Sequence, residues 1–82
     1  MKVLRLLVLS DTNVVDDGLR HLSSLINLRV LGLDRTRISD AGLEHLTGLR
    51  NLELLGITGT EVTDQGIMRL KSKLPMLELS DS

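Results

Sequence analysis

Residues 28–46 have the sequence LRVLGLDRTRISDAGLEHL, and this pattern recurs before and after them at an interval of 24 residues. A fixed period of this length is typical of stacked supersecondary units, each of which contacts only its neighbours. The 82-residue chain is therefore predicted to form a single domain, with repeats at about residues 4–27, 28–51 and 52–76 and a terminal strand at 77–79. The coinciding positions include Leu4, Leu28 and Leu52; Leu7, Leu31 and Leu55; Leu9, Leu33 and Ile57; Asp16, Asp40 and Asp64; and Leu22, Leu46 and Leu70.

The middle repeat predicts a short strand, a polar turn and a short helix. Residues 28–33 are aliphatic and alternate toward their end, which favours a strand. Because strand side chains alternate, Leu31 and Leu33 should face inward and Val30 outward. Ser39 is expected to offer its hydroxyl as an N-cap to a helix over residues 40–46. Each repeat is therefore predicted to be a strand–turn–helix unit.

The helix starts differ between repeats. Thr63 is expected to cap the third helix, whereas Val15 occupies the cap position of the first. Asp16 is therefore expected to take over the capping there, or the first helix to fray. Glycine recurs in the first helical turn, at positions 18, 42 and 66. Glycine destabilises a helix by about 1 kcal/mol relative to alanine, so its recurrence favours a close approach of neighbouring backbones over a flexible turn.

Threonine recurs directly after the strands, at positions 12, 36 and 60. A hydroxyl can both donate and accept a hydrogen bond. These threonines are expected to satisfy turn carbonyls and amides from one coil to the next, which is a structural role.

The unit Leu-x-x-Leu-x-Leu-x-x-Thr-x-Ile-Ser-Asp-x-Gly-Leu-x-x-Leu of residues 28–46 resembles a leucine-rich repeat in which Thr replaces the usual Asn after the strand. Its second half is similar to bacterial GALA-type repeats and to the related cysteine-containing repeats of F-box adaptors. The resemblance implies an α/β solenoid, a right-handed coil with a concave parallel β-sheet of three full strands plus a short C-terminal edge strand. It places short helices on the convex side. It also implies recognition rather than catalysis, as part of a larger bacterial repeat protein. No F-box segment is present, so no ubiquitin-ligase link is carried over.

Composition argues against several classes of function. The chain has 10 Lys and Arg against 11 Asp and Glu, and this balance gives no field that would attract nucleic acid or a membrane surface. It has no Cys or Tyr, and its glycines match no phosphate-binding loop. His21 and His45 share a register, but adjacent helices stand too far apart to place both on one metal ion. The chain is predicted not to be an enzyme and to bind no metal or cofactor.

The outward strand positions and the loops beside them form the candidate binding surface. One row is aliphatic throughout, which indicates either an apolar strip for a partner or a simple preference for branched residues in strands. Arginine is the only strong anchor type available for a protein interface, because the chain has no aromatic residue. The candidate residues are Leu6, Val30 and Leu54 in the row; Val8 beside it; Arg5, Arg29 and Glu53 before the strands; and Asp34, Arg35 and Thr58 after them.

Two kinds of partner are predicted. The first is a protein of unknown identity, bound on the concave sheet. The alternative is a second copy of the chain, because no polar capping element precedes Leu4 and the first repeat would leave an open apolar end at Leu4, Leu7, Leu9, Leu19 and Leu22. Earlier repeats of a longer array, of which this chain would be the C-terminal part, are the other expected cover for this end. The tail differs: Leu74-Pro75 followed by an edge strand at Leu77 to Leu79 is expected to close the last coil.

Overall fold

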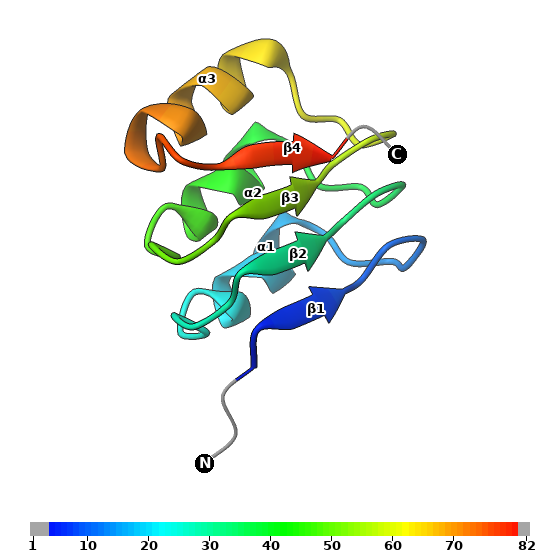
Figure 1. The fold of residues 1–82 in the computed structure, drawn as a ribbon. Coiled ribbons are helices and arrows are strands. Elements are labelled where there is room, and N and C mark those ends of the chain that lie inside the picture. The colour runs from blue at the N-terminus through cyan, green and yellow to red at the C-terminus, as the bar shows by residue number, and fades with distance from the viewer. Residues whose placement is uncertain (1–3, 81–82) are drawn as a thin grey trace.

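The computed structural model describes residues 4–80 as a stack of short strands and helices in strict alternation (Figure 1). The four strands form one sheet in the order β1-β2-β3-β4, and every neighbouring pair is parallel. Each repeat therefore adds one strand beside the last, as a solenoid requires. The elements are β1 (Leu6–Val8), α1 (Asp16–Leu19), the 3-10 helix η1 (Arg20–Leu22), β2 (Val30–Gly32), α2 (Asp40–Leu43), the 3-10 helix η2 (Glu44–Leu46), β3 (Leu54–Gly56), α3 (Asp64–Lys73) and β4 (Glu78–Ser80).

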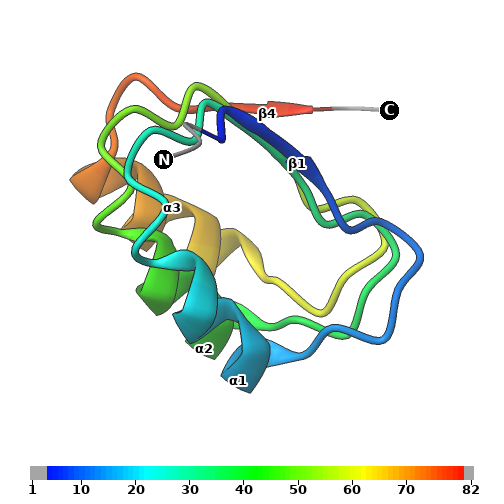
Figure 2. The ribbon, with the colours of Figure 1, turned by 90° about the horizontal axis from the view of Figure 1, so that it is seen from below.

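The sheet and the helices form two layers with a leucine core between them. Figure 2 shows the three α-helices stacked on one side and the strands along the opposite side. Leu31 and Leu33 face the helices and are fully buried, as the alternation of β2 predicts. The buried core comprises Leu19, Leu28, Leu31, Leu33, Ile38, Leu43, Leu46, Leu49, Leu52, Leu55, Ile57, Leu70, Leu74 and Leu77.

The strand register keeps the 24-residue spacing through all four strands. Leu6 pairs with Val30, Val30 with Leu54, and Leu54 with Glu78. The predicted terminal strand at 77–79 was therefore one residue early, because β4 runs from Glu78 to Ser80. Leu77 instead turns inward and is 2% exposed.

The threonines after the strands act within their own coil rather than between coils. Each hydroxyl donates to the backbone carbonyl three residues earlier: Thr12 to Leu9 at 2.5 Å, Thr36 to Leu33 at 2.8 Å and Thr60 to Ile57 at 2.6 Å. The expectation of bonds from one coil to the next was wrong, because the nearest free acceptor is the carbonyl at the end of the same strand. The hydroxyls close the turn that leaves the sheet.

Consecutive coils are joined instead by the recurring aspartates. The Asp16 carboxylate accepts from the backbone N–H of Ser39 at 2.7 Å and from its hydroxyl at 2.5 Å. Asp40 accepts in the same way from the backbone N–H of Thr63 at 2.8 Å and from its hydroxyl. Each carboxylate therefore lies at the N-terminus of the next helix, where negative charge is favourable.

This arrangement corrects the predicted helix caps. The Ser39 hydroxyl makes no cap bond to its own helix, because it donates to Asp16. Asp16 does not cap α1, and α1 is as long as α2 although Val15 offers no cap bond. Only the Thr63 prediction is confirmed, since its hydroxyl accepts from the backbone N–H of Gly66 at 3.3 Å.

The helix glycines make room for these carboxylates. A Cβ on Gly42 would collide with the Asp16 carboxylate and with a methyl group of Leu19, and a Cβ on Gly66 would collide with Asp40. The close approach at these glycines is therefore by a side chain of the preceding coil, not by neighbouring backbones as the sequence suggested.

Candidate binding face

The face of the sheet that points away from the helices carries the predicted aliphatic row. Leu6, Val30 and Leu54 are side by side in the strand register, at the spacing of parallel strands. Leu6 is 57% exposed and Leu54 37%, while Val30 between them is half-buried. Val8 projects from the same face of β1 and is 63% exposed. The structure brings these four side chains together on one accessible surface.

Beside Val8 the same face is recessed, because the second row continues in glycine. Val8 pairs with Gly32, and Gly32 with Gly56. A Cβ on Gly56 would lie 2.8 Å from a carboxylate oxygen of Asp34, so glycine is needed here for the Asp34 side chain to lie across the end of the strand. The outward face is therefore apolar toward β1, whereas the Asp34 carboxylate covers the buried Gly56 at the end of β3.

Polar side chains after the strands are bonded to one another across the coils. The Ser10 hydroxyl accepts from the backbone N–H of Asp34 at 3.2 Å, and the Asp34 carboxylate accepts from the backbone N–H of Thr58 at 2.8 Å. The Thr58 hydroxyl donates to the carbonyl of Ser80 at 3.4 Å. Asp34 and Thr58 thus help to fix the loops that border the candidate face.

Arg35 makes the best-formed ion pair of the described residues. Its Nε donates to Asp11 Oδ1 at 2.7 Å and its Nη2 donates to Asp11 Oδ2 at 2.8 Å. This bidentate geometry lowers the pKa of Asp11 below its ordinary value and raises the pKa of Arg35. Both residues have positive φ angles, 63° for Asp11 and 56° for Arg35. Arg35 is therefore held by Asp11 of the preceding coil and is less free to contact a partner than the sequence suggested.

The charged side chains before the strands are exposed. Arg29 Nε lies 3.8 Å from Glu53 Oε2, and the two side chains are 56% and 66% exposed. A pair this open contributes under about 1 kcal/mol. Arg5 is exposed at the end of β1 and takes part in no ion pair within the described chain. Of the three arginines on the candidate face, Arg5 and Arg29 are therefore more available to a partner than Arg35.

The sequence-based interpretation of this face omitted its fourth strand. Glu78 continues the aliphatic row and Ser80 the glycine row. The 24-residue interval from Leu54 to Glu78 could have identified both residues. The expected strand was instead placed on Leu77 to Leu79, one residue before the observed β4.

Residues 4–80 contain neither a cluster of metal-binding side chains nor a helix that could cross a membrane. No group of three or more His, Cys, Asp or Glu side chains there could hold a metal ion. His21 is exposed and His45 is half-buried. None of the helices in this range is both long and apolar enough to cross a membrane.

Known structures share the fold of this chain. No protein-family model and no curated protein matches it. An internalin of Listeria monocytogenes matches over 93% of this chain with a TM-score of 0.73 and 23% sequence identity. A leucine-rich repeat protein of Leptospira interrogans matches over 93% with a TM-score of 0.66 and 16% identity. The chain spans 21% and 25% of the lengths of these two proteins. The narrower resemblance to GALA-type repeats stays a prediction, whereas the repeated strand and helix units, the single parallel sheet and both neighbours agree that the chain is a leucine-rich repeat solenoid.

Proposed function

We propose that this chain is a protein-interaction module that presents the outward face of its sheet to a partner and performs no catalysis. The observation that supports this most directly is the exposure of Leu6, Val8 and Leu54 on one continuous face. Contiguous exposed aliphatic side chains are a feature of interaction sites. Arg5 and Arg29 lie at the border of this strip, and arginine is enriched among residues that dominate binding energy.

The alternative function is self-assembly, and a separate observation favours it. Leu7, Leu9 and Leu22 of the first coil are half-buried, although their counterparts in the middle coil are fully buried. Leu4 is 40% exposed, while Leu28 at the equivalent position is fully buried. This open apolar end, together with the free edge of β1, is a surface that a second copy could cover. Leu19 does not belong to it, contrary to the sequence-based expectation, because it is completely buried beneath the second coil.

One pair of substitutions separates the two functions. In a variant with Val30→Asp and Leu54→Asp, both charges fall on the outward face and away from the first-coil end. The matched control is Met68→Asp on α3, because Met68 is 71% exposed and lies outside the sheet. Proteins retained by the immobilised wild type are compared with those retained by each variant, and sedimentation velocity gives the oligomeric state of each.

An interaction module predicts that the wild type and Met68→Asp retain the same partner, and that the double variant loses it without a change in oligomeric state. Self-assembly predicts instead a concentration-dependent oligomer that Leu4→Asp disrupts. If the double variant retains every partner at wild-type level and circular dichroism shows it to be folded, the proposed face is wrong.

A further inference from the structure

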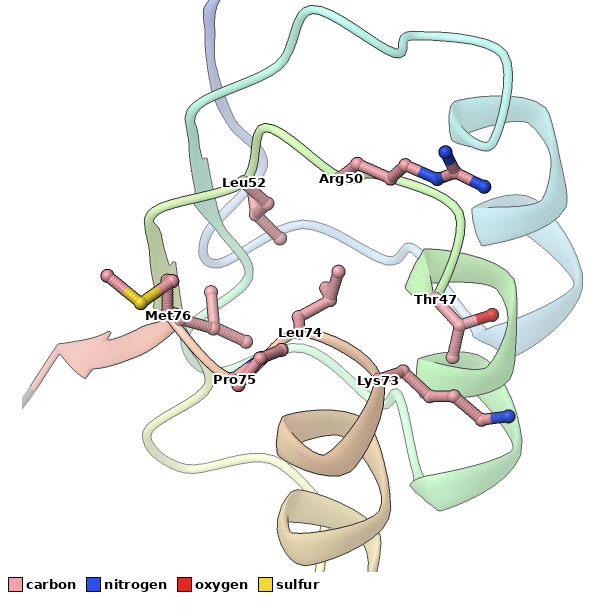
Figure 3. Close-up of a pocket in the computed structure, with 8 residues that line it drawn as sticks. Thr47, Arg50, Leu52, Lys73, Leu74, Pro75 and Met76 are labelled. Carbon is pink, nitrogen blue, oxygen red and sulfur yellow. The ribbon is translucent and has the colours of Figure 1, made fainter.

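A pocket of about 340 Å³ opens between the last two coils, on the side where the chain enters the strands. Its floor is apolar, formed by Leu52, Leu74 and Leu77, which are nearly or completely buried. In Figure 3, Arg50 and Lys73 extend on opposite sides of the opening, with Leu74 between them. Thr47, Pro75 and Met76 complete the lining. The pocket is separate from the outward face of the sheet.

The pocket exists because the last two coils are out of step there. Leu74 follows Leu49 by 25 residues and Leu77 follows Leu52 by 25, although the strands keep the interval of 24. The extra residue lies in α3, which is one continuous α-helix of 10 residues where α1 and α2 have 4 and continue as 3-10 helices. The loop after α3 therefore does not stack directly on the loop after η2, and the mismatch leaves space above Leu52.

The same shift changes the hydrogen bonding at the opening. In the coil below, the Asn51 side-chain amide donates to the carbonyl of Ile26 at 3.0 Å and so joins the two loops. Met76 occupies the equivalent place in the last coil, one residue before Leu77, and its side chain has no hydrogen-bond donor. Met76 is 86% exposed instead. The last coil thus has no side-chain hydrogen bond from this position to the preceding loop, and the flexible apolar side chain of Met76 lies at the rim of the pocket instead.

The charged side chains that line the pocket are all positive. Arg50 and Lys73 are both exposed, and no acidic residue lines the pocket. Within residues 4–80 the ion pairs of arginine and lysine are Arg29 with Glu53 and Arg35 with Asp11, so neither Arg50 nor Lys73 is neutralised by one. Lys73 lies in the last turn of α3, where it balances the helix dipole, but Lys71 does the same from outside the pocket.

We propose that this pocket binds a segment of a partner protein in which an acidic side chain lies next to an aliphatic one. The aliphatic side chain occupies the space over Leu52, Leu74 and Leu77, and the carboxylate pairs with Arg50 and Lys73. A volume of about 340 Å³ is at the low end of the range for ligand sites, about 300–1,000 Å³. It suits one or two side chains rather than a large cofactor. Met76 can adapt to the shape of the bound side chain, because methionine is unbranched and polarizable.

The test is a selection from displayed random peptides on the immobilised chain. Counter-selection uses a variant with Arg50→Glu and Lys73→Glu. The matched control carries Arg20→Glu and Lys71→Glu, which change the net charge equally at two exposed residues outside the pocket. A fluorescent copy of the most enriched peptide is then titrated by anisotropy against the wild type and both variants, and against Val30→Asp with Leu54→Asp.

Enriched peptides are expected to carry Asp or Glu beside Leu, Ile or Val. Their affinity is expected to fall at least tenfold in the pocket variant, an effect of about 1.4 kcal/mol, and to stay unchanged in the control and in the sheet variant. The proposal is overturned if no peptide is enriched relative to the pocket variant, or if the enriched peptides lack an acidic residue. It is equally overturned if Arg20→Glu with Lys71→Glu weakens binding as much, because the effect then comes from net charge. Loss of binding only in the sheet variant would instead support the proposed function and reject this site.

Discussion

The first and the middle coil have the same core leucines at equivalent positions, yet they are packed very differently. Leu46 in the middle coil is completely buried, whereas Leu22 at the equivalent place is half-buried. The middle coil is covered on both sides, by Asp16 and Leu19 from below and by Thr63 from above. Within residues 4–80 the first coil is covered on one side only, by the second coil. The comparison teaches that a repeat position acquires its energetic role from its neighbours, as expected when stability is a sum of repeat and interface contributions.

The largest expected difference is in the core leucines. Leu46→Ala should lower the free energy of unfolding by about 2–5 kcal/mol, because it leaves a cavity in a fully packed site. Leu22→Ala should lower it clearly less, because Leu22 is already in part exposed to water. Urea unfolding of the two variants measures both values. Equal effects would contradict the comparison and would show that the first coil is covered in solution.

A smaller difference is expected at the helix glycines, where replacement by alanine should change the stability in opposite directions in the two coils. Gly42→Ala should destabilise the chain by about 1–3 kcal/mol, because the added methyl group displaces Asp16 and Leu19. Gly18→Ala should instead be neutral or stabilise by up to about 1 kcal/mol, because alanine favours the helix. The added Cβ there meets only a methyl group of Val14, at 3.3 Å. Thermal unfolding followed by circular dichroism measures both changes. A strongly destabilising Gly18→Ala would mean that something occupies the space below the first coil.

The smallest expected effect is a dependence of the unfolding free energy on pH, caused by the aspartate carboxylates that join consecutive coils. The hydroxyl and then the backbone N–H of Thr63 hold the pKa of Asp40 below its ordinary value of 3.8. A lowered folded-state pKa adds stability that is present above the unfolded pKa and is lost as the pH falls through the folded pKa. Asp40→Asn should therefore destabilise the chain near neutral pH, and its deficit relative to the wild type should shrink below about pH 4.

The control for this titration is Asp64→Asn. Asp64 occupies the equivalent position in the last helix, but it is exposed and accepts no hydrogen bond from another coil within residues 4–80. Urea unfolding of the wild type and both variants between about pH 5 and about pH 2 measures the two deficits, and that of Asp64→Asn should be the smaller because this carboxylate holds no other coil within residues 4–80. A deficit of Asp40→Asn that stays constant across this range would show that the carboxylate charge does not link the coils.

Most of the fold could be predicted from the sequence. The 24-residue interval and the alternation around Leu31 predicted where β1, β2 and β3 lie and which residues form the outward row, Leu6, Val30 and Leu54. The strand is shorter than predicted, since β2 covers only Val30–Gly32 of residues 28–33. The prediction failed where a rule for a single helix was applied to a side chain whose hydrogen-bond partner lies in the neighbouring coil. Ser39 has the right type and place for an N-cap, but its hydroxyl donates to Asp16, which lies 23 residues earlier in the chain.

The sequence alone was sufficient to predict the repeated strand–turn–helix unit, because the 24-residue period and the alternation of apolar residues recur in each repeat. The resemblance to leucine-rich repeats then supplied the stacking of these units on one parallel sheet. The three-dimensional structure was needed to show how each repeat is joined to the next. The joint brings together groups that are far apart in the sequence: the carboxylate of Asp16, the hydroxyl of Ser39 and the space beside Gly42. The pocket beside Leu74 is likewise a feature of the tertiary structure alone. The sequence shows that Leu74 is one residue out of step, but a cavity forms only where two neighbouring loops fail to cover each other.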